Sequence, residues 1–158
     1  MDWITRGSTL FLKWAKVVGL GIVVLAATGY VTLQYVPPAI ANAAFISAID
    51  ANKILTSHPD TLVLDVRTPG EYYGELGHLK DAVNIDYWQI PTALKAGSPI
   101  FDLPKSTQIL IHCHTDVRAS IASRTLKSAG FNNISVIDDG IVGWHKAKLP
   151  VVYSPPRN

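Results

Sequence analysis

The sequence contains a single cysteine, Cys113, at a position where a thiol could act as a nucleophile. The apolar run at residues 108–111 predicts a buried strand directly before it, and residues 116–129 predict a helix soon after it. Backbone N–H groups converge at such a strand-to-helix loop, and the helix dipole favours negative charge there. The position therefore predicts a lowered thiol pKa and a nucleophilic thiolate near neutral pH. The alternative is that Cys113 is a small buried apolar residue, as free cysteines often are.

Composition excludes several kinds of partner and site. The formal net charge is +2, and Arg6, Lys13 and Lys16 against Asp2 account for all of it. From residue 44 onward there are 11 basic and 11 acidic residues, so no surface for nucleic acid is predicted. One cysteine excludes an internal disulfide and a multi-cysteine metal site. We therefore predict no metal and no cofactor.

Residues 1–43 predict a membrane-directed segment. The stretch at 17–36 is apolar, has about the length of one bilayer-spanning helix, and follows basic residues. It is either an uncleaved membrane anchor, forming one apolar N-terminal helix, or a signal peptide cut after the small-x-small sequence at 41–43. Both alternatives place a domain at residues 44–154, with a tail at 155–158, outside the cytoplasm on the periplasmic side. The membrane is a partner only if the segment stays uncleaved.

Short apolar runs alternate with helical stretches between residues 44 and 154. The predicted strands are 61–66, 82–85, 107–113 and 134–137, and the predicted helices are 48–56, 87–96, 116–129 and 141–146. This alternation predicts an α/β fold with a mostly parallel sheet. Ligand sites in such sheets lie at the carboxyl ends of the strands, where Cys113, Asp65 and Arg67 fall.

Details between these elements can also be predicted. Residues 45–49 are expected to be an apolar lead-in, with Ser47 capping the helix at 48–56. Residues 97–105 are expected to be a loop. The helix at 116–129 has one apolar face, formed by Val117, Ile121, Ala122 and Ala129.

Three groups of residues, in order over 61–151, together resemble the rhodanese-like family. The first is LVLDVR at 62–67 with Glu71-Tyr72, followed by GHL at 77–79 and AVNI at 82–85. The second is Cys113 with Arg118 after four intervening residues. The third is DGIVGW at 139–144 with LPV at 149–151. The resemblance also leads us to expect that Trp144 is a core residue.

The resemblance implies a central, mostly parallel sheet of about five strands flanked by helices. It also implies a sulfurtransferase in which Cys113 takes sulfane sulfur from thiosulfate or a persulfide, becomes a persulfide itself, and passes the sulfur to a thiol or cyanide. The implied substrate-binding residues are His114, Thr115, Asp116, Val117 and Arg118. Asp65 and Arg67 are implied to support the loop, as are Glu71 and His78, rather than to react. The alternative function is a non-catalytic rhodanese-like binding module at the membrane.

Loop length and departures from the family pattern qualify this prediction. Related phosphatases place five residues between the cysteine and the arginine, whereas this chain has four. Asp116 stands where many members have glycine, and its charge opposes the thiolate, although aspartate tolerates a positive φ. Ala119 stands where serine or threonine is common. Asp139 and the Lys80-Asp81 pair replace glycine-containing positions and are expected to be surface changes.

Overall fold

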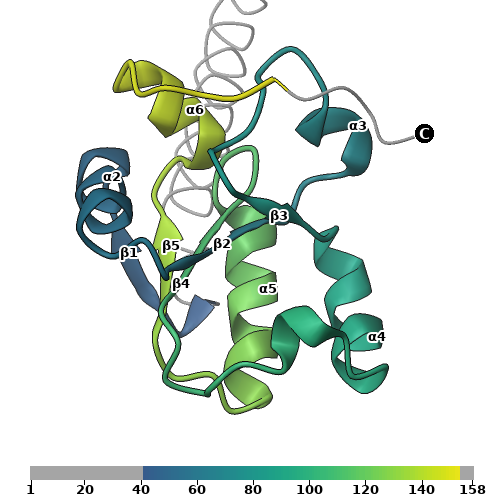
Figure 1. The fold of residues 1–158 in the computed structure, drawn as a ribbon. Coiled ribbons are helices and arrows are strands. Elements are labelled where there is room, and N and C mark those ends of the chain that lie inside the picture. The colour runs from purple at the N-terminus through teal and green to yellow at the C-terminus, as the bar shows by residue number, and fades with distance from the viewer. Residues whose placement is uncertain (1–40, 154–158) are drawn as a thin grey trace, which may run out of the picture. The chain divides into compact units, whose positions relative to one another are not determined.

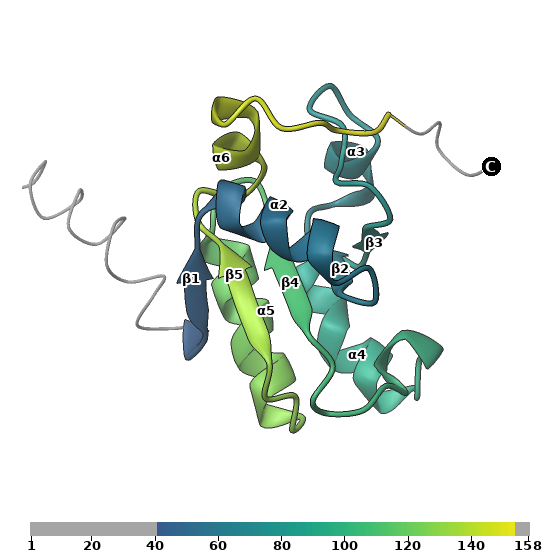
Figure 2. The same cartoon turned by 60° about the vertical axis from the view of Figure 1, so that its left-hand side comes forward.

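The computed structural model describes residues 41–153, which form a parallel five-stranded sheet between two layers of helices (Figures 1 and 2). The strands are β1 (Ala44–Ile46), β2 (Leu62–Asp65), β3 (Val83–Asn84), β4 (Ile109–His112) and β5 (Ile134–Ile137). Their order across the sheet is β1-β5-β4-β2-β3. Every pair of neighbouring strands is parallel, which confirms the predicted α/β fold.

Helices follow the strands and cover both faces of the sheet. They are α2 (Ala48–Ser57), α3 (Pro69–Tyr72), α4 (Ile90–Lys95), α5 (Val117–Ser128) and α6 (Gly140–Lys146), with 3-10 turns η1 (Tyr87–Gln89) and η2 (Pro99–Phe101). The two views show α4 and α5 on one face and α2 and α6 on the other (Figures 1 and 2).

The central strand β4 shows why both faces are covered. All four of its residues are buried. Because side chains alternate along a strand, Ile109 and Ile111 pack in the cluster under α5, while Leu110 packs with α2 and α6 residues. A continuous apolar strand of this kind needs an apolar layer on each side, as is typical of parallel sheets.

The edge of the sheet that β1 forms differs from the prediction. The apolar lead-in contains a strand, β1, which pairs with β5 from Ala44 opposite Ser135 to Ile46 opposite Ile137. A three-residue edge strand carries too little pattern to be recognised locally, and its partner lies about 90 residues away. The predicted cap is confirmed, because the Ser47 hydroxyl accepts a hydrogen bond from the Asp50 N–H at 3.1 Å.

Two further predictions need correction. The helix at 87–96 is divided into η1 and α4, and the predicted loop after it contains η2. On α5, Val117 and Ile121 are 39% and 40% exposed, whereas Ala122 and Leu126 are fully buried. The helix therefore packs Ala122 and Leu126, rather than Val117 and Ile121, into the core.

The predicted signal or anchor segment lies almost wholly outside the described residues, as does the tail. Within residues 41–153, we find no helix that is both long and apolar enough to cross a membrane. Ala41, the first described residue, is buried, and its carbonyl accepts a hydrogen bond from the Ser123 hydroxyl of α5 at 3.0 Å.

Candidate active site

Cys113 follows β4 directly and lies at the carboxyl edge of the sheet. The backbone N–H groups of Ala119, Arg118 and Thr115 donate toward its sulfur, so the loop and the first turn of α5 form a cradle of donors. Such a cradle can stabilise negative charge on a thiolate or on a sulfur atom attached to it. The structure thus brings together Cys113 and the loop that the sequence singled out.

Burial changes the expected acidity of this thiol. Cys113 is only 1% exposed. Removal from water raises the pKa of the Cys113 thiol above its ordinary value, although the loop amides and the Arg118 guanidinium oppose the rise. The sequence prediction of a lowered pKa has the wrong direction, because it counted the hydrogen-bond donors and could not count desolvation.

The N-terminus of α6 holds the loop in place through two backbone hydrogen bonds. The N–H of Ile141 donates to the Cys113 carbonyl at 2.9 Å, and that of Val142 donates to the His114 carbonyl at 3.2 Å. Gly140 has a φ of +50°, and a Cβ built on it would lie 2.0 Å from the Thr115 carbonyl oxygen. Only glycine fits here, because the loop backbone touches the position that a side chain would occupy.

Asp139 and Asp81 occupy positions where the family pattern led us to expect glycine. Both are left-handed, with φ of +55° and +59°. Aspartate adopts this conformation at lower cost than most residues, which explains how the backbone is retained. Asp81 is exposed, whereas Asp139 is half-buried and forms an ion pair with Lys146.

Arg118 is held by a bidentate ion pair with Glu71 of α3. Its two terminal nitrogens donate to the two Glu71 oxygens, each at 2.6 Å. Glu71 also accepts hydrogen bonds from the hydroxyl and N–H of Thr68 in a capping box. The Arg118 guanidinium holds the pKa of Glu71 down at about 2. Nothing local in the sequence marks this pair, whose members are 47 residues apart.

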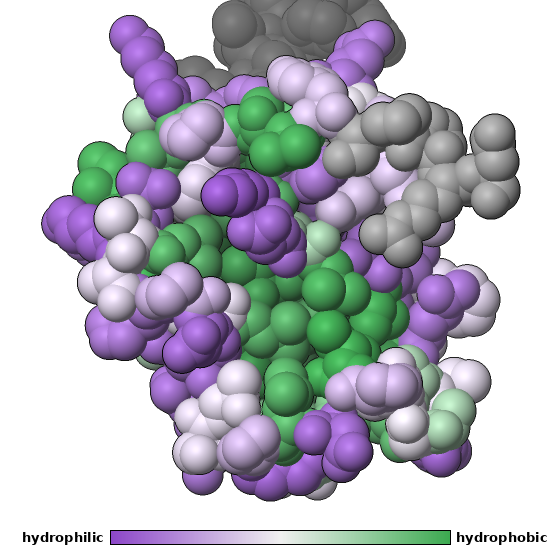
Figure 3. Space-filling model, viewed as in Figure 1, coloured by the Kyte–Doolittle hydropathy of each residue, from purple (hydrophilic) through white to green (hydrophobic). Residues whose placement is uncertain are grey.

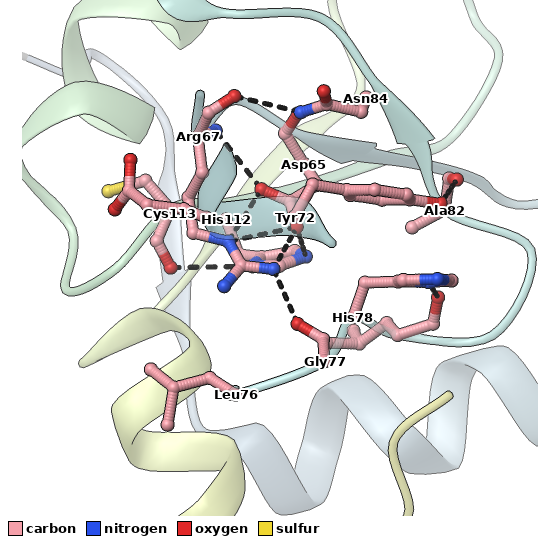
Figure 4. A network of polar contacts seen from close by, with 12 residues as sticks. Asp65, Arg67, Tyr72, Leu76, Gly77, His78, Ala82, Asn84, His112 and Cys113 are labelled. Atoms are coloured by element: carbon pink, nitrogen blue, oxygen red, sulfur yellow. Dashed lines mark hydrogen bonds and ion pairs between the residues drawn. The ribbon is translucent and has the colours of Figure 1, made fainter. Parts of the chain in front are cut away.

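A buried polar network underlies the site, and Figure 4 shows its members. Arg67 donates to both carboxylate oxygens of Asp65, at 2.5–3.0 Å, and to the Gly77 carbonyl at 2.7 Å. The Asn84 side chain donates to the Asp65 and Arg67 carbonyls at 3.0 and 2.8 Å. Buried charges paired in this way join β2, β3 and the Gly77 segment. The contacts of Asp65 and Arg67 within it are those of supporting residues.

His112, directly before Cys113, belongs to the same network. It is fully buried, with its Nε2 atom 3.6 Å from an Asp65 oxygen and its Nδ1 atom 3.4 Å from the Cys113 carbonyl oxygen. Burial lowers the pKa of His112, against the opposing charge of Asp65, and favours the neutral imidazole. His78 lies farther out, stacked on Tyr72 with ring centroids 3.9 Å apart (Figure 4).

The remaining loop residues lie near the surface. His114 and Thr115 are exposed, and Asp116 is half-buried. Asp116 has a φ of −146°, so the loop closes without the positive φ that we considered. Burial and the charges of Asp138 and Asp139 raise the pKa of Asp116.

Trp144 is 2% exposed and packs in the core cluster with α2 residues, as predicted.

A parallel sheet with a buried cysteine on a strand-to-helix loop defines the class of the protein: an α/β domain that places its cysteine at the carboxyl edge of the sheet. The rhodanese-like domain model matches residues 47–147, and the chain belongs to the rhodanese-like family.

Relatives and solved structures agree with this assignment. A sulfurtransferase of Allochromatium vinosum is 26% identical over 110 residues, which are 68% of this chain and 95% of that protein. The senescence-associated protein DIN1 of Raphanus sativus is 35% identical over 96 residues, covering 56% of this chain and half of the length of that protein. The polysulfide-sulfur transferase homodimer of Wolinella succinogenes has a similar structure, with a TM-score of 0.61 and 27% identity, covering 77% of this chain and 88% of that one.

Proposed function

We propose that the protein is a sulfurtransferase in which Cys113 carries sulfane sulfur as a persulfide. The observation that carries this proposal is the cradle of three backbone N–H groups around the Cys113 sulfur. Two of the similar proteins are named for sulfur transfer, which supports the same reaction here. The loop of four residues between Cys113 and Arg118 also fits one sulfur atom better than a phosphate group, which the five-residue loops of phosphatases hold.

The reaction has two steps that balance without an added oxidant or reductant. The Cys113 thiolate attacks the outer sulfur of thiosulfate, a polysulfide or a persulfide; the new S–S bond forms as the old one breaks, and sulfite or the shortened donor leaves with the electron pair. A thiol or cyanide then attacks the outer sulfur of the Cys113 persulfide. That step regenerates the thiolate and yields a persulfide or thiocyanate. The loop amides stabilise the charge on the sulfur in each step.

Mass spectrometry of the intact protein tests this function. After incubation with thiosulfate or with polysulfide, the protein should gain the mass of one sulfur atom, and cyanide should remove it and release thiocyanate. The variant Cys113→Ser should gain nothing. Absence of the added mass with both donors would contradict the proposed activity.

A non-catalytic rhodanese-like binding module is the second candidate. The burial of Cys113 and the raised pKa of its thiol favour this alternative, because both reduce the thiolate available at neutral pH. The two candidates differ in whether Cys113 takes up sulfur. A module without chemistry should gain no mass from thiosulfate or polysulfide at any pH up to 9, whereas the enzyme should gain the mass of one sulfur atom faster as the thiolate forms.

We also propose that residues 1–43 direct the domain across a membrane, as an anchor or a cleaved signal peptide. The apolar stretch at 17–36 after basic residues supports this. A reporter fused after Asn158 should be active outside the cytoplasm. N-terminal sequencing then separates the alternatives, since a start at Ala44 means cleavage and a retained start means an anchor.

A further inference from the structure

Apolar side chains are exposed together on the face formed by η1, α4 and α5. Trp88 of η1 is 64% exposed, and Val117 and Ile121 lie one turn apart on α5. The 3-10 turn packs against this helix. Figure 3 shows apolar surface gathered across the middle of this face with polar side chains around it. We call Trp88, Val117 and Ile121 the α5 patch; large apolar residues exposed on one face of this kind mark interaction sites.

The α5 patch borders the candidate active site. Val117 is the last of the four residues between Cys113 and Arg118, and Ile121 is on the next turn of the same helix. A molecule that lies along α5 therefore has one end at the loop that cradles the sulfur.

The helical segments that form the α5 patch carry basic side chains, although Asp116 directly precedes Val117. The segments η1, α4 and α5 contain four basic residues and no acidic ones, although acidic and basic residues are equal in number from residue 44 onward. The basic residues are Lys95, Arg118, Arg124 and Lys127. Glu71 neutralises Arg118, but Arg124 is exposed three residues beyond Ile121. The complementary surface is apolar and acidic.

We propose that the α5 patch docks a protein that presents a cysteine within an acidic, apolar surface, and that this cysteine accepts the sulfur from Cys113. The inference rests on the proposed function and names its acceptor class. Tryptophan and arginine, here Trp88 and Arg124, are enriched among the residues that dominate binding energy at protein interfaces. In the transfer, the partner's thiolate attacks the outer sulfur of the Cys113 persulfide. The S–S bond at Cys113 breaks, Cys113 leaves as a thiolate, and any proton on the outer sulfur stays there.

Two synthetic peptides and cyanide test the proposal on the full-length, sulfur-loaded protein. One peptide places a cysteine among glutamate and leucine residues, and the other has lysine in place of each glutamate. The acidic peptide should accept sulfur about tenfold faster than the basic peptide at low salt, and added salt should shrink the difference. The rate of sulfur transfer to cyanide measures the reactivity of the Cys113 persulfide without a docking step.

Variants of the α5 patch should separate docking from chemistry. Ile121→Gln and Trp88→Ser should slow transfer to the acidic peptide about tenfold and leave the rate of transfer to cyanide unchanged. Arg124→Glu, on an exposed side chain, should abolish the preference for the acidic peptide. The matched controls are Ile49→Gln, whose isoleucine is 54% exposed on α2, and Lys80→Glu, which changes the net charge equally.

Several results would overturn the inference. Unchanged peptide rates in all three patch variants would mean that the patch docks nothing in this reaction. Equal slowing of peptide and cyanide would mean that the variants disturb the loop instead. A dimer seen by light scattering that becomes a monomer in Ile121→Gln would assign the patch to a second copy of the chain. Failure of the wild-type protein to take up sulfur would refute the proposed function itself, and the acceptor role with it.

Discussion

Replacing Glu71 with glutamine removes one charge from the pair that joins α3 to α5. Glutamine keeps the size of the side chain and can still accept one hydrogen bond from Arg118 and one from Thr68. The variant therefore removes the negative charge together with one of the two hydrogen bonds that Glu71 accepts from Arg118, each at 2.6 Å. We expect Glu71→Gln to fold and to be less stable than the wild-type protein at neutral pH.

The structure sets the size of the loss. Lowering the pKa of Glu71 from 4.5 to about 2 corresponds to about 3 kcal/mol if the whole shift contributed to stability. The side chains of Arg118 and Glu71 are 25% and 34% exposed, so solvent screens part of this interaction. We therefore expect Glu71→Gln to lower the free energy of unfolding by about 1–2 kcal/mol.

The pH dependence identifies the cause. Because the pKa of Glu71 is lower in the folded chain than in the unfolded chain, its contribution is complete above about pH 4.5 and is lost as the pH falls toward 2. Urea unfolding of both proteins at pH 7, 5, 4 and 3 should show a difference in the free energy of unfolding that is constant above about pH 4.5 and shrinks below it. Asp50→Asn is the control: its pair with Lys53 is mostly exposed, and its loss should be smaller. Equal stability at pH 7, or a difference that persists unchanged to pH 3, would refute the reasoning.

Three more predictions follow from the loop. The rate of Cys113 alkylation should rise with a midpoint above that of a free cysteine measured beside it, because burial raises the pKa of its thiol; a midpoint at or below that of the free cysteine would contradict this. Gly140→Ala should lower the free energy of unfolding by about 2 kcal/mol or more and abolish sulfur uptake, whereas Gly97→Ala, also left-handed but with open space around it, should cost only about 1 kcal/mol in urea unfolding. Asp116→Asn should raise stability at pH 7 and not near pH 3, because the raised pKa of Asp116 means that the fold disfavours its charge; equal stability at both pH values would count against this.

Much of the fold could be predicted because it is encoded locally. The strand at 134–137 and the boundaries of α2 agree with the prediction almost residue for residue, since dense apolar runs and a serine cap act within a few positions. The strand β1 escaped prediction because its three residues gain their pairing only from β5. Val117 and Ile121 were expected on the buried face for a related reason: the spacing of apolar residues suggests a face, but tertiary packing decides which residues enter the core.

The sequence by itself determined the position of Cys113 at the carboxyl end of a parallel strand and the number of residues between Cys113 and Arg118. These properties depend on residue type and on spacing along the chain. Only the tertiary structure decided that Glu71 holds Arg118, that Gly140 admits the loop backbone, and that the pKa of Cys113 rises instead of falling. The physical reason is that ion pairing, close approach and desolvation depend on atoms that folding brings together from distant parts of the chain, and spacing along the sequence does not measure those distances.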